Sequence, residues 1–234
     1  MRTVNVDEEE DDSMIPDYEG SNLKMAVNAT STKKRMIYSR KVFTVTASIF
    51  LTYAVGCMTL FMTPGVREFV QQNQFIIFLC VPLPLFSKLL LSKFEHMSFL
   101  PRVYFLIPIL LHLIAIFLSI SSFSLFFDTE VVYFSCFTIF INSLQLVLYT
   151  LQSHILSMSQ IILLLLIGTP LSSYIIRNLL GIYLFPFFQV VIISLLTSFY
   201  VCFNVTYFMK SYTSSDWPLA LISVFSHVPV FLTS

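Results

Sequence analysis

The chain has 234 residues, of which 56% are hydrophobic and only 11% are charged, and its mean hydropathy is +0.82. Soluble domains carry about 25% charged residues, so these values exclude a soluble fold of this size. The net charge of zero averages two unlike segments, because eight of the 13 acidic residues lie in the first 19 positions. The rest of the chain is too weakly charged to bind nucleic acid, and we expect its surface to face the lipid bilayer.

Residues 1–35 are predicted to form a tail that is first acidic and then basic. Residues 1–30 are polar and cannot bury enough apolar surface to offset the entropy of ordering, so we expect them to be disordered. No apolar stretch follows a basic start, as it does in a cleaved signal peptide. The membrane domain is predicted to cover residues 36–234.

The first membrane span is predicted from an apolar run of 21 residues, Val42 to Met62. This length matches the ~20 residues that cross ~30 Å of hydrocarbon as a helix. Six further apolar runs follow at 75–92, 103–126, 131–151, 155–176, 184–208 and 217–233. Because backbone groups in hydrocarbon need internal partners, we predict an all-α polytopic membrane protein with seven transmembrane helices. The last run contains Pro218 and Pro229, so it either spans or re-enters the membrane.

The distribution of basic residues predicts the orientation of the spans. Nine Lys and Arg residues lie on the amino-terminal side of the predicted spans, against Arg67 and Arg177 on the other side. We therefore expect a cytosolic amino terminus. The nine are Lys33, Lys34, Arg35, Arg40, Lys41, Lys88, Lys93, Arg102 and Lys210.

Sequence motifs for catalysis and metal binding are missing from the chain. It has no HExxH, P-loop, GxSxG or glycine-rich dinucleotide motif, so we predict that it is not an enzyme and has no cofactor. The cysteines lie in apolar runs without zinc spacing, and we expect them to pack as small hydrophobic side chains. They are Cys57, Cys80, Cys136 and Cys202.

Ionisable side chains inside predicted spans are candidates for function, because each costs ~2.5–3.5 kcal/mol at the helix centre. His227, in the last run, is either a neutral histidine held by a hydroxyl or a proton sensor, since its unperturbed pKa is near ~6.5. His112 is expected to face the bundle and form hydrogen bonds. Four amides, Asn142, Gln145, Gln152 and Gln189, are expected to form hydrogen bonds between helices.

Two motifs on either side of the first span carry a family resemblance. They read Arg40-Lys41-Val42-Phe43 and Val66-Arg67-Glu68-Phe69-Val70-Gln71-Gln72-Asn73, and with the span between them they cover 34 residues. This stretch resembles the amino-terminal signature of the Bax inhibitor-1 or Lifeguard family. The resemblance implies a seven-helix protein of the endoplasmic reticulum, Golgi or plasma membrane that suppresses cell death and passes calcium. It marks as signature residues Arg40, Lys41, Val66, Arg67, Phe69 and Val70.

The family's calcium leak is attributed to two aspartates, one in the sixth helix and one in the seventh. Asn204 stands at the first of these positions and His227 at the second, 23 residues later. Ca²⁺ prefers carboxylate oxygens, so the resemblance implies a leak that is altered or lost. A second match, Phe127-Asp128-Thr129-Glu130, is closer in letters, but its position predicts a connecting loop. The resemblance also makes Lys88 a candidate for the cationic latch that some relatives place on the second helix. Its position near the end of a span favours the other interpretation, in which the side chain snorkels so that its charged group reaches the membrane surface.

The function implied by the resemblance is modulation of cell death or of intracellular calcium homeostasis through membrane-protein partners. Three alternatives stay open from the sequence: a calcium-permeable leak channel, a family member without transport, and an orphan seven-helix receptor. The intact signature and the short loops count against the receptor.

Overall fold

A computed structural model describes residues 32–95, 106–152, 158–180 and 184–210, together with Leu221, Val224 and Phe225. Within these ranges the chain is helical and contains no β-strand. The helices in chain order are α1 (Thr32–Met62), α2 (Val66–Gln72), α3 (Phe75–Cys80), α4 (Leu83–Glu95), α5 (Leu106–Phe126), α6 (Val131–Tyr149), α7 (Met158–Leu180) and α8 (Leu184–Phe208).

Five of these helices, α1 and α5 to α8, are long and apolar enough to cross a membrane. A sixth crossing exists if α2 and the segment from Phe75 to Leu90, which meet at 86°, form one broken span. These are the features of a multi-pass membrane protein. The predicted run 217–233 lies outside the described residues except for Leu221, Val224 and Phe225.

The apolar runs predicted at 103–126, 131–151, 155–176 and 184–208 correspond to α5, α6, α7 and α8. The run at 75–92 differs, because a turn at Val81 and Pro82 divides it into α3 and α4. Proline lacks a backbone N–H and crowds the preceding turn of a helix, which accounts for the break. The first helix begins ten residues before its apolar run, so the basic residues from Lys33 to Lys41 lie on α1 itself.

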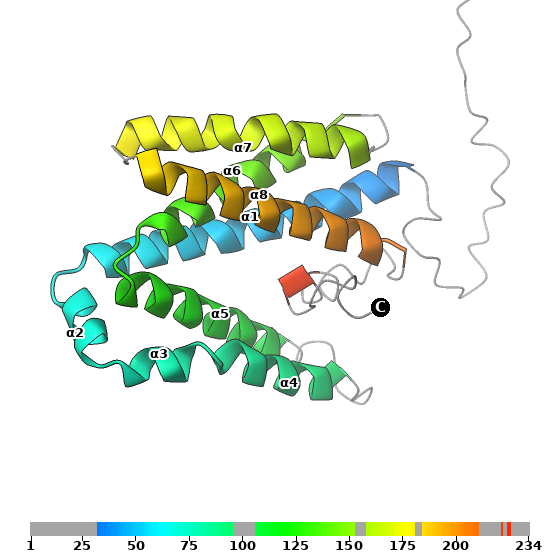
Figure 1. Cartoon of the computed structure of the whole chain (residues 1–234). Helices are drawn as coiled ribbons and strands as arrows, with labels where there is room; N and C mark the ends of the chain where they lie inside the picture. The colour runs from blue at the N-terminus through cyan, green and yellow to red at the C-terminus, as the bar shows by residue number, and fades with distance from the viewer. Residues whose placement is uncertain are drawn as a thin grey trace, which may run out of the picture.

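Helix α1 lies between two groups of helices (Figure 1). On one side it packs along α6, which in turn contacts α7 and α8. On the other side it contacts α5, which packs against α2, α3 and α4. We call these groups the α6–α8 sector and the α3–α5 sector.

The bundle has two ends of unlike charge. Hydrogen bonds from Ser39 to Met209 and from Arg40 to Thr150 bring the start of α1 to the ends of α6 and α8. Six described basic side chains lie at this basic end: Lys33, Lys34, Arg35, Arg40, Lys41 and Lys210. The opposite end holds the turn between α5 and α6, with the Arg67–Asp128 ion pair, and Arg177 beside the ring of Phe187.

Candidate functional site

The buried amide side chain of Asn142 links the three helices of the α6–α8 sector. Asn142 of α6 is fully buried, and its Nδ2 donates to Thr169 Oγ1 of α7 and Ser198 Oγ of α8, both at 2.9 Å. Ser172 Oγ of α7 donates to Asn142 Oδ1 at 3.4 Å. One side chain therefore joins three helices, which is the interhelical role expected for Asn142. Of the other amides predicted in this role, Gln189 is exposed on α8 and Gln152 is exposed beyond α6.

Asn204, at the first family aspartate position, is buried in α8. Its Nδ2 donates to the carbonyl of Tyr200 in the same helix at 2.8 Å, so one amide hydrogen is used within α8. The amide is neutral and brings no charge to the interior. His227, at the second position, lies outside the described residues.

His112 lies on the buried face of α5 and joins three segments of the chain. Its Nδ1 is 2.8 Å from Ser87 Oγ of α4, and its Nε2 is 3.4 Å from the backbone oxygen of Phe225. A neutral ring with the proton on Nε2 fits both contacts when the Ser87 hydroxyl, which also lies 3.0 Å from the carbonyl oxygen of Pro84, donates to Nδ1. His112 thus forms hydrogen bonds inside the bundle, as its position in the apolar run predicts.

Lys88 follows Ser87 on α4 and is half-buried. Its neighbour Ser87 lies 2.8 Å from the His112 ring. Among the described side chains, no carboxylate forms an ion pair with Lys88. The structure therefore groups Lys88 with His112, whereas no described hydrogen bond joins Asn204 to this pair.

A half-open cavity of about 450 Å³ lies between α1, α4, α5, α6 and α8. Its walls are mostly aliphatic and aromatic, and include Tyr53 of α1, Ile116 of α5, Ile139 of α6 and Val201 of α8. Phe225 also lines it, so the residue whose carbonyl oxygen lies 3.4 Å from His112 Nε2 belongs to the cavity wall. Apolar composition alone does not locate this space, because the same residue types fill the lipid-facing surfaces.

At the basic end, the signature residue Arg40 caps the carboxyl-terminal end of α6. Its Nη2 donates to the backbone oxygen of Thr150, the residue that caps α6, at 2.8 Å, and its Nε is 3.5 Å from Thr150 Oγ1. The last carbonyls of a helix have no partner within it and carry partial negative charge. A guanidinium is therefore a favourable cap. Lys41, the next signature residue, is exposed on α1.

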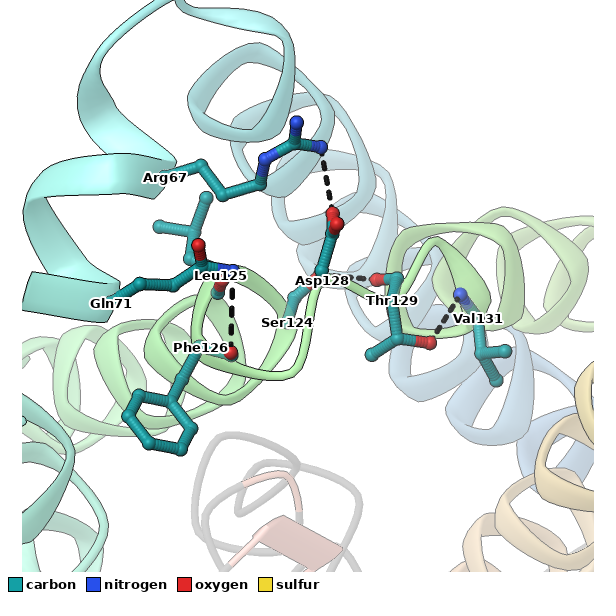
Figure 2. A network of polar contacts seen from close by, with 8 residues as sticks. All are labelled: Arg67, Gln71, Ser124, Leu125, Phe126, Asp128, Thr129 and Val131. Carbon is teal, nitrogen blue, oxygen red and sulfur yellow. Dashed lines mark hydrogen bonds and ion pairs between the residues drawn. The ribbon is translucent and has the colours of Figure 1, made fainter.

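At the opposite end, Arg67 Nη1 and Asp128 Oδ1 form an ion pair at 2.7 Å (Figure 2). Gln71 Nε2 is 3.4 Å and 3.5 Å from the carbonyl oxygens of Leu125 and Phe126, at the end of α5. Of the other signature residues on α2, Val70 is buried, Val66 is half-buried and Phe69 is 58% exposed. The second signature motif thus binds α2 to the α5–α6 turn.

The acidic motif Phe127-Asp128-Thr129-Glu130 forms this turn, as its position predicts. Asp128 adopts a left-handed conformation with φ of 51°, which aspartate tolerates better than most residues. Ser124 Oγ donates to the Thr129 carbonyl at 2.7 Å, and Thr129 Oγ1 accepts from the Val131 backbone N–H at 3.3 Å (Figure 2). These bonds end α5 and begin α6.

The four cysteines pack as predicted. All are free, with three buried and Cys80 half-buried. Sequence reasoning missed Ser87 and Thr150, because a serine or threonine near a helix end carries no signal of its partner.

No protein-family model, curated protein or solved structure matches the chain. The functional argument therefore rests on the residues and contacts described above.

Proposed function

We propose that the chain is a divergent Lifeguard-like membrane protein that modulates cell death or intracellular calcium homeostasis through membrane-protein partners. The observation that carries the proposal is the placement of the two signature arginines. Arg40 caps α6 across 110 positions of sequence, and Arg67 pairs with Asp128 across 61. The motif that resembles the family thus contains residues that hold distant helices together, which gives a physical reason for arginine at both positions.

The proposed topology has seven transmembrane helices. Helices α1, α5, α6, α7 and α8 supply five, the broken span of α2 with the segment from Phe75 to Leu90 supplies another, and the run 217–233 supplies the last. With the basic end cytosolic, as the positive-inside rule favours, the amino terminus is cytosolic. The membrane is that of the endoplasmic reticulum, Golgi or cell surface.

We propose that any calcium leak through the bundle is weak. The family positions carry Asn204 and His227, and the buried polar side chains of the described residues are hydroxyls, two asparagines and His112, with no carboxylate. Ca²⁺ needs carboxylate oxygens to replace its water. The chain accordingly acts through membrane partners, without enzymatic activity or a cofactor.

The first experiment measures the leak. The full chain in liposomes is expected to show little calcium flux, and Asn204→Asp with His227→Asp is expected to raise it by restoring both carboxylates. Gln189→Asp, on the exposed face of α8, is the control and leaves flux unchanged. A strong leak that neither position affects would support the channel alternative and refute the alignment.

The second experiment tests the role in cells. Expression of the chain is expected to reduce death after an apoptotic stimulus or to lower the calcium content of the endoplasmic reticulum. The variant Arg40→Gln with Arg67→Gln loses this effect at an equal membrane level, while Lys41→Gln keeps it. A chain that changes neither quantity contradicts the proposal.

A further inference from the structure

The cavity in the bundle has a polar rim on one side. Three wall residues, Pro84 of α4, Ile116 of α5 and Tyr200 of α8, each have an ionisable or amide residue four positions away. These neighbours are Lys88, His112 and Asn204. Residues four apart lie on the same face of a helix, about 6 Å apart along its axis at ~1.5 Å per residue.

The three rim residues are displaced from the cavity in the same direction. Helices α4 and α8 run toward the basic end, and α5 runs away from it (Figure 1). Lys88 and Asn204 follow their wall residues in sequence, whereas His112 precedes its own. All three therefore lie on the basic-end side of the cavity, and the hydrogen bond between His112 and Phe225 ties the rim to the wall.

The charge at this rim is unbalanced. Lys88 is half-buried, and no carboxylate pairs with it in the ranges that the structure covers. Ionisable side chains at membrane depth are costly and normally have a partner or face a pathway. An anionic group at the rim would supply that partner.

The cavity wall also holds an unused polar group. Ser135 of α6 lines the cavity, and its Oγ is buried without a hydrogen-bond partner in the described part of the chain. The rest of the wall is mostly apolar, and the volume of about 450 Å³ lies toward the lower end of the ~300–1,000 Å³ typical of ligand pockets. This size suits one acyl chain better than two.

From these observations we propose that the cavity binds a single-chain amphiphile, with its acyl chain between α1, α5, α6 and α8 and an anionic head group at Lys88. The head group lies toward the basic end, and the chain points toward the opposite end. This is the direction of a lipid in the leaflet at the basic end. The binding site is independent of the calcium and cell-death roles proposed above.

The test uses the full chain in nanodiscs of phosphatidylcholine and a photoreactive palmitate as the probe. Crosslinks are expected in peptides of α5, α6 and α8 that line the cavity. Unlabelled palmitate competes, and the fatty alcohol of equal chain length competes at least tenfold more weakly, because it lacks the charge. The anionic head group is either a carboxylate or a phosphate, and lysophosphatidate distinguishes the two. Stronger competition by lysophosphatidate than by palmitate identifies a phosphate head group, and weaker competition identifies a carboxylate.

Two matched pairs of variants locate the site. Lys88→Gln is expected to weaken palmitate binding about tenfold, the usual effect of losing a hydrogen bond to a charged group. Lys88→Arg keeps the positive charge and is expected to bind palmitate as the unmodified chain does. Lys41→Gln, at an exposed position of α1, is expected to leave binding unchanged. Ser119→Phe, which fills the cavity from α5, is expected to abolish crosslinking. Ser48→Phe, on an exposed face of α1, leaves crosslinking intact.

Three results would overturn the proposal. One is crosslinking confined to lipid-facing surfaces such as that of α3, and another is equal competition by the fatty alcohol. The third is unchanged binding in Lys88→Gln. Thermal stability of each variant separates lost binding from lost folding, and the Lys88 series decides the question if Ser119→Phe does not fold.

Discussion

The two sectors of the bundle both consist largely of apolar helices but are held together differently. In the α6–α8 sector, Asn142 forms hydrogen bonds to two other helices, and the facing positions are hydroxyl residues. Eight buried hydroxyls belong to these three helices: Ser135, Thr138, Ser143, Thr169, Ser172, Ser173, Ser194 and Ser198. In the α3–α5 sector, the buried polar link between described helices is the contact of Ser87 with His112.

The difference shows that insertion and assembly depend on different residues. Lipid tails are as apolar as leucine, so apolar side chains bring a helix into the membrane but give little reason to leave lipid for another helix. Phe78 of α3 illustrates this, since it is 78% exposed. Small and hydroxyl residues allow close contact, and in the α6–α8 sector Thr169, Ser172 and Ser198 meet the amide of Asn142 in this way.

The largest expected effect is that of Asn142→Leu. It removes three interhelical hydrogen bonds at about 0.6 kcal/mol each, so we expect a loss of about 2 kcal/mol in the free energy of unfolding. Unfolding by SDS in bicelles measures it. Gln189→Leu, on the exposed face of α8, is the control with no expected change. Equal stability of the two variants would show that the amide does not hold the sector together.

The next effect concerns the contact of α1 with the α3–α5 sector. A Cβ at Gly56 would lie 2.7 Å and 2.8 Å from two ring carbons of Phe117, so Gly56→Ala requires the ring to move. We expect a loss of about 1 kcal/mol from this overpacking. A Cβ at Gly168 would instead meet the amide end of Gln145, which can rotate away.

Gly168→Ala is therefore the matched control, and a smaller loss is expected for it. The same SDS titration compares the two variants. A larger loss in Gly168→Ala would mean that the Gln145 side chain cannot move aside, whereas the Phe117 ring can.

Ser87→Ala tests the buried link between α4 and α5 that the described residues show. One hydrogen bond to His112 is lost, and we expect a change of about 0.6 kcal/mol, roughly a third of the effect at Asn142. Ser87→Thr keeps the hydroxyl and serves as the control. If Ser87→Ala lowers the free energy of unfolding as much as Asn142→Leu does, polar contacts stabilise the two sectors equally.

The smallest effect is expected at the opposite end of the bundle. Arg67 and Asp128 are 42% and 52% exposed, so Arg67→Gln should cost only about 0.3 kcal/mol, and less in high salt, because water and ions screen the pair. Asp128→Asn, which also tolerates a positive φ, is expected to behave alike. Asp128→Val should cost more, because a β-branched residue is strained at φ of 51°. Thermal unfolding at two salt concentrations distinguishes these outcomes.

Much of the helical architecture follows from residues close together in sequence. The apolar runs of α5 to α8 are long enough to cross hydrocarbon, where a backbone must form its hydrogen bonds within the helix. The turn at residues 127–130 follows from its polar side chains between two such runs. The division of the run 75–92 had a local cause in Pro82, yet a proline inside an apolar run is also compatible with a bent but continuous helix.

The sequence by itself thus determined the membrane class, the helical state and the position of most spans, because hydrocarbon acts on each segment separately. Only the tertiary structure decided the partners: Thr150 for Arg40, Asp128 for Arg67, and three hydroxyls for Asn142. These contacts join residues 27 to 110 positions apart. The local pattern of apolar residues is the same whichever helices pack together. Which helix packs against which therefore depends on where small and polar side chains meet across the bundle.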